Sequence, residues 1–68
     1  METHRDIISA IGAKRLAEAT GQSVDKVYVW AHRAAIPPLY WGQVLPLVRK
    51  HRISLDRMRE MYDRREYP

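Results

Sequence analysis

The three histidines are the natural starting point in a search for catalysis or metal binding. His4, His32 and His51 lie too far apart for one helix to present two of them as metal ligands, and no paired carboxylates accompany them. Cysteine is absent, so neither a thiolate nucleophile nor a thiolate metal site can form. His4 and His51 are expected in solvent. We therefore expect no catalytic residue, no metal, no cofactor and no enzyme activity.

A second kind of chemistry, non-covalent binding, is available between Gln22 and Arg33. Cationic, aromatic and aliphatic side chains are mixed in this stretch. Valine methyl groups can contact thymine methyl groups, while Tyr, Lys, His and Arg side chains such as Lys26 and Arg33 can reach base edges or phosphates. Backbone N–H groups near Gln22 and Ser23 can bind a phosphate where a helix begins. The mixture favours contact with the major groove of DNA.

Two short helices, residues 13–20 and 23–33, must position these side chains. Ala17 lies four residues before Gly21, which suits a left-handed position after the first helix. Two helices that cross over a short turn need a small side chain at the crossing and a positive φ in the turn, and these two residues meet both needs. The spacing predicts a helix-turn-helix over residues 13–33.

The second of these helices has one apolar stripe. Its members recur at i, i+3, i+4 and i+7 and are Val27, Trp30, Ala31 and Ala34. Burying this stripe against the first helix leaves Lys26, Tyr28 and Val29 in solvent. An exposed helix face with apolar and basic groups together is unusual for a merely solvated helix.

The rest of the chain predicts further helices and little strand. Thr3 caps a first helix that Gly12 ends, Pro38 opens a fourth, and Ser54 caps a last helix over residues 54–65. No repeat, linker or low-complexity tract divides the 68 residues. We expect an all-α fold, a small bundle of about five helices in a single domain over residues 1–68.

At this point the sequence resembles the Cro and lambda-repressor family of helix-turn-helix regulators. The resemblance covers residues 5–48 and centres on residues 13–23 with Val27 and Trp30, followed by Ile36-Pro37-Pro38 as in Cro-like phage regulators. It implies that residues 23–33 form the recognition helix of a lambda-repressor-like DNA-binding domain. Carried over by position, it implies phosphate contacts from Lys14 and Ser23. The base-reading residues that it implies are Val24, Asp25, Tyr28 and Val29, with His32 near the groove edge.

The basic residues of the chain include further candidates for phosphate contacts. Twelve Lys and Arg residues against eight Asp and Glu give a net charge of +4, which favours a polyanionic partner. Arg49, Lys50 and Arg52 end a predicted helix and have few acidic neighbours. The phosphate-contact candidates are thus Lys14, Gln22, Ser23, Lys26, Arg33, Arg49, Lys50 and Arg52.

The last helix has an apolar stripe made of Leu55, Met58, Met61 and Tyr62. It can fold back over the core of its own chain, or it can pair with the same stripe of a second subunit. A two-fold dimer would place two recognition helices about 34 Å apart, one turn of DNA. We favour a homodimer, at least on DNA.

These patterns predict a cytoplasmic, sequence-specific transcriptional regulator, a phage- or prophage-like repressor that occupies double-stranded DNA. No segment has the length or composition of a membrane span or a signal peptide, and no small-molecule ligand is expected. The alternative is a protein-protein interaction module, such as an antitoxin or a phage-encoded inhibitor, whose exposed Val24, Tyr28 and Val29 dock on another protein.

Overall fold

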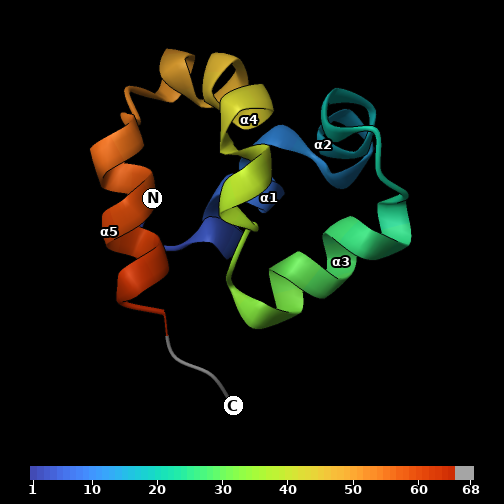
Figure 1. The fold of residues 1–68 in the computed structure, drawn as a ribbon, viewed down its shortest axis with the longest axis horizontal. Helices are drawn as coiled ribbons and strands as arrows, with labels where there is room; N and C mark the ends of the chain where they lie inside the picture. The colour runs from blue at the N-terminus through green and yellow to red at the C-terminus, as the bar shows by residue number, and fades with distance from the viewer. Residues whose placement is uncertain (66–68) are drawn as a thin grey trace.

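Five α-helices and two short 3-10 helices make up most of residues 1–65, the part of the chain that the computed structural model describes (Figure 1). No strand occurs in this part, so the all-α prediction is confirmed. Residues 66–68 of the predicted domain lie outside the described range. In chain order the elements are α1 (His4–Ile11), α2 (Ala13–Thr20), α3 (Val24–Arg33), η1 (Pro38–Tyr40), α4 (Trp41–Val48), η2 (Arg49–His51) and α5 (Leu55–Asp63).

Side-chain caps fix where three of the helices begin, as predicted. The Thr3 hydroxyl accepts the N–H of Asp6 at 3.2 Å, and the Asp6 carboxylate accepts the N–H of Thr3, which completes a capping box. Ser23 accepts the N–H of Lys26 at 3.1 Å at the start of α3, and Ser54 caps α5 in the same way.

Two details at helix ends differ from the sequence expectation. The third helix ends at Arg33 as predicted, but Ala34, a member of its predicted apolar stripe, lies just beyond that end and adopts a left-handed conformation with φ 54°. The sequence does not predict a left-handed residue at this position, because glycine is the residue usually found there and here it is an alanine. Pro38 opens the 3-10 helix η1, and the fourth α-helix begins three residues later at Trp41.

The helices pack around α1. It contacts α2, α3, α4 and α5, and Figure 1 shows it behind α4, with α5 on one side and the α2–α3 pair on the other. The side chains that lose all contact with solvent are aliphatic or methionine, apart from one histidine. They are Ile7, Leu16, Val27, Ile36, Val44, Val48, Met58 and His4.

Helix α5 folds back onto the core of its own chain. Met58 is fully buried and Met61 is 2% exposed. The structure therefore corrects the prediction that these two methionines form a dimerisation surface, since side chains enclosed by their own core cannot contact a second subunit. Leu55, which is 51% exposed, and the partly buried Tyr62 are the accessible members of the stripe.

His4, expected in solvent, is fully buried. Its Nδ1 accepts the backbone N–H of Ile36 at 2.8 Å, and its Nε2 lies 2.8 Å from the carbonyl oxygen of Met58. Since Nδ1 is an acceptor, the proton of the neutral ring is on Nε2, which donates to Met58. One side chain thus joins α1 to α5 and to the segment between α3 and η1.

Aromatic contacts hold the His4 ring in this position. Trp41 packs edge-on against it with ring centroids 5.9 Å apart, and Tyr62 lies at the same distance. Burial lowers the pKa of the His4 imidazole below its ordinary value of 6.5; the hydrogen bond to Met58 opposes this shift, and the charge of Arg65 adds to it. Protonation of Nδ1 would also break the bond from Ile36.

Acidification is predicted to destabilise the fold through His4. Below pH 6.5 the unfolded chain binds a proton at this residue that the folded chain does not, so the free energy of unfolding falls by up to about 1.4 kcal/mol per pH unit. Urea unfolding between pH 5 and 8 measures this slope. His4→Gln should remove it. In the wild type, NMR should find that the pKa of the His4 ring is lower than its ordinary value of 6.5; a pKa at or above that value would contradict the prediction.

The turn after α2 gives a second prediction. Gly21 has φ 70°, and a Cβ at this position would meet no atom within 4 Å. Gly21→Ala should therefore lower the free energy of unfolding by about 1 kcal/mol through backbone strain alone. Gly42 is the matched control, because it lies in α4 in open space with an ordinary helical φ. Gly42→Ala should raise the stability by about 0.5–1 kcal/mol. Urea denaturation of both variants should give opposite signs.

Candidate nucleic-acid interface

A three-residue turn, Gly21 to Ser23, joins α2 to α3. The carbonyl of Ala17 accepts the N–H of Gly21 and also that of Gln22, the latter at 3.0 Å. The left-handed conformation of Gly21 lets both N–H groups reach this one carbonyl oxygen, and Ser23 then caps the next helix. Ala17 is 5% exposed, so its small side chain is enclosed where α2 meets its neighbours.

Helix α3 is fixed from two directions. Val27 and Trp30 are buried on its inner side. At its C-terminal end, the guanidinium of Arg5 donates to the carbonyl of Ala31 at 2.8 Å and to that of His32 at 3.1 Å. A cation at this end also interacts favourably with the helix dipole. Sequence reasoning missed Arg5, because nothing local connects it to carbonyl groups 26 and 27 residues away.

The outer side of α3 carries one continuous stripe of exposed side chains. Asp25, Tyr28, Val29 and His32 stand at i, i+3, i+4 and i+7 and are all exposed. Tyr28 is 59% and Val29 42% exposed, and they are two of only a few large hydrophobic side chains that the described part of the chain leaves in solvent. Four of the five predicted base-reading residues therefore share one accessible face.

The fifth base-reading candidate, Val24, is placed differently. It is half-buried and packs against the hydrophobic core from the first turn of α3. Its side chain is thus shared between the core and the surface.

Five of the predicted phosphate contacts lie on the α2–α3 pair. Lys26 and Arg33 are exposed on α3, and Lys14 is exposed on α2. None of the three forms an ion pair within residues 1–65. Gln22 is half-buried in the turn, and the Ser23 hydroxyl is engaged as the cap of α3. Two positive charges on α3 beside the exposed stripe, and a third on α2, are thus available to an external anion.

Arg49, Lys50 and Arg52 are exposed but lie elsewhere. They belong to η2 and the residue that follows it, and Figure 1 shows this segment above α4, at the opposite end of the molecule from α3. The structure therefore does not gather these three cations with the α3 stripe. Sequence position alone could not reveal this, because the path of the chain after α4 decides it.

The remaining basic residues of α5 and its end are paired. Glu60 contacts the guanidinium groups of Arg57 and Arg64, and Arg59 contacts Asp63 at 4.0 Å. Such pairs cancel charge on an exposed helix face. The cations of α3 differ from those of α5 in having no acidic partner within residues 1–65, and the cations in and after η2 share this property.

No protein-family model, curated protein or solved structure matches the chain. Within residues 1–65 no helix is long and apolar enough to cross a membrane, and no three His, Asp or Glu side chains are placed to hold a metal ion.

Proposed function

We propose that the protein is a sequence-specific DNA-binding regulator in which α2 and α3 form a helix-turn-helix and α3 enters the major groove. The observation that carries this proposal is the exposed stripe of Asp25, Tyr28, Val29 and His32, on a helix whose opposite side is locked into the core. A helix held this rigidly presents its outer side chains without reorganisation, which favours reading of base edges.

The chemistry of the stripe suits a mixture of direct contacts. The Val29 methyl groups can pack on a thymine methyl group, and the Asp25 carboxylate can accept a hydrogen bond from the amino group of cytosine. The Tyr28 hydroxyl and the His32 ring can reach base edges or phosphates. Asp25 also repels phosphate, so it favours a pose in which it faces bases rather than the backbone.

The cations around the stripe supply the non-specific part of the affinity. Lys26 and Arg33 flank it on α3, and Lys14 can brace the backbone from α2. Each contact neutralises a phosphate and releases a counterion. The regulator acts without covalent chemistry, in the cytoplasm, by occupying its site.

A homodimer on DNA is part of the proposal. Two-fold pairing would place two copies of α3 about 34 Å apart on a pseudo-palindromic site. With Met58 and Met61 inside the monomer, Leu55 is the exposed apolar residue of α5 that is available for pairing.

The second candidate function is docking of the same stripe on a protein, favoured by the exposure of Tyr28 and Val29. Selection from a pool of randomised DNA duplexes separates the two, because it tests binding and preference together. Recovery of one recurring sequence supports the DNA-binding proposal. A pool that stays random, with no retention at low salt, would favour the protein-docking function.

Salt dependence provides a quantitative prediction. If Lys14, Lys26 and Arg33 each neutralise one phosphate, the logarithm of the binding constant should fall against the logarithm of salt concentration with a slope of about −3 per subunit. Fluorescence anisotropy of a labelled duplex between 50 and 200 mM salt would measure it. Binding that does not change with salt would contradict the phosphate contacts.

Substitutions should separate base contacts from phosphate contacts. Tyr28→Ala or Val29→Ala should cost about 1–3 kcal/mol on the preferred duplex and relax preference, whereas Lys26→Ala should weaken all duplexes alike and reduce the salt slope by about 1. Arg49→Ala removes the same charge far from α3 and should leave the affinity close to that of the wild type. If Arg49→Ala and Lys26→Ala behave identically, α3 is not the binding face.

A further inference from the structure

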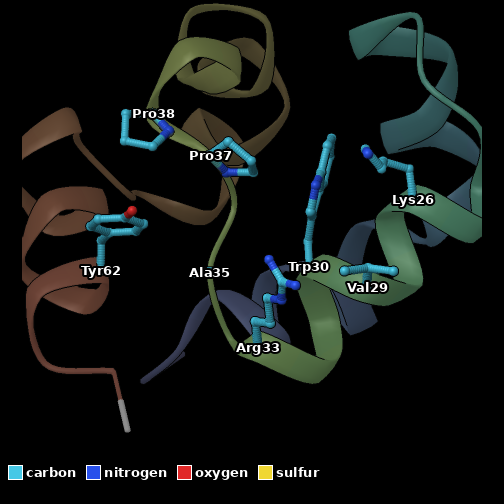
Figure 2. Close-up of a pocket in the computed structure, with 8 residues that line it drawn as sticks. All are labelled: Lys26, Val29, Trp30, Arg33, Ala35, Pro37, Pro38 and Tyr62. Carbon is cyan, nitrogen blue, oxygen red and sulfur yellow. The ribbon is translucent and has the colours of Figure 1, made fainter. Parts of the chain in front are cut away.

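A pocket of about 330 Å³ opens along the flank of α3 (Figure 2). Lys26, Trp30 and Arg33 line it from α3, the Pro37–Pro38 segment lines it from across, and Tyr62 closes one end from α5. It lies beside the exposed stripe and shares Val29 with it. Its volume is at the lower end of the range for small-molecule sites.

The indole of Trp30 provides a hydrogen-bond donor without a protein partner. Trp30 is 3% exposed, and its N–H donates to no acceptor within residues 1–65. No fully enclosed side-chain nitrogen in this part of the chain lacks a partner, so the Trp30 nitrogen retains some access to solvent. Trp30 is one of the residues that line this pocket. By contrast, the Trp41 indole N–H donates to the carbonyl of Ile36 at 2.8 Å.

The Trp30 ring is also rigid. Tyr40 packs on it with ring centroids 5.1 Å apart and planes inclined by 32°. In Figure 2 the Trp30 ring stands between Lys26 and Pro37. The guanidinium of Arg33 points toward the gap between Trp30 and Pro37. The donor is therefore pre-oriented, and a ligand would not have to order it.

The charge of the pocket has a single sign. Lys26 and Arg33 carry its two charges, and neither has an acidic partner within residues 1–65. None of the described residues that line it is acidic. Together with the Trp30 N–H, the two cations offer hydrogen-bond donors to one anionic group and would repel a cation.

The remaining walls are apolar. Val29, Pro37, Pro38 and the ring of Tyr62 form them. An apolar cavity of about 150 Å³ already holds a benzene ring, so this pocket has room for one ring and a carboxylate. A bare inorganic ion would leave these walls wet, whereas a ring-bearing anion would cover them and gain from their burial.

We propose that this pocket binds a small organic anion, a carboxylate carried on a single aromatic or similarly compact apolar body. The carboxylate accepts from the Trp30 N–H and from the cations of Lys26 and Arg33, and the body packs against Pro37, Pro38 and Tyr62. This departs from the sequence expectation of no small-molecule ligand, because the pocket exists only where α3, α5 and the segment before η1 meet.

Occupancy would regulate the proposed function. A bound carboxylate would neutralise Lys26 and Arg33, two of the cations assigned to phosphates, and would lie next to Val29. Benzoate should therefore weaken DNA binding; this consequence rests on the proposed function, whereas the binding of the anion itself does not.

Titration of the full 15N-labelled chain with benzoate tests the site without DNA. The two tryptophans give separate indole N–H signals, and we expect a saturable shift of the Trp30 signal with little change at Trp41. Benzamide, which keeps the ring but not the charge, should bind at least tenfold more weakly, and so should acetate and inorganic phosphate, which lack the ring. Equal shifts at both indoles, or equal binding of benzoate and phosphate, would overturn the proposal.

Variants at exposed positions sharpen the test. Lys26→Met and Arg33→Gln should each weaken benzoate binding at least fivefold, since each removes a charged donor. Lys50→Met removes a cation on η2, away from the pocket, and should leave the binding unchanged. If all three variants weaken it equally, benzoate responds to net charge alone and the site does not exist.

The pocket and the DNA-binding function can fail separately. Failure of benzoate binding with intact DNA binding would reject the pocket only. Saturable benzoate binding without DNA binding would reject the DNA proposal only.

Discussion

The buried ring of His4 is the interaction on which the packing of this chain most depends. No disulfide can form, because the chain lacks cysteine, so helices distant in sequence must be joined by side chains. His4 joins three segments with two hydrogen bonds: its Nδ1 receives the Ile36 N–H and its Nε2 donates to the Met58 carbonyl. The core around it is apolar, and a buried polar ring there is tolerated only because both nitrogens are satisfied.

The next residue extends this constraint to the candidate interface. Arg5 binds the last carbonyls of α3 while His4 holds Ile36, three residues beyond the end of that helix. The first turn of α1 therefore fixes both α3 and the segment that leads to Pro37 and Pro38. The proposed DNA-binding stripe and the proposed anion pocket are neighbours on α3 and share Val29, so both depend on this one anchored connection.

Ion pairing differs between α5 and the α2–α3 pair. On α5, acidic and basic side chains pair within one helical turn and cancel. On α2 and α3, Lys14, Lys26 and Arg33 have no acidic partner among the described residues, and the exposed cations in and after η2 have none either. Unpaired cations next to exposed apolar groups lower the stability of the fold, because the charges repel one another and the apolar groups remain in water. An anionic partner would supply the missing contacts at this surface.

The sequence by itself determined the helices, the caps at Thr3, Ser23 and Ser54, and the left-handed turn at Gly21, because each of these depends on groups within four residues of one another. It also determined which side of α3 is outermost. Only the tertiary structure decided that His4 is buried, that α5 encloses Met58 and that η2 lies far from α3. Those outcomes depend on partners as much as 54 residues apart, and a local pattern cannot specify which distant groups will meet.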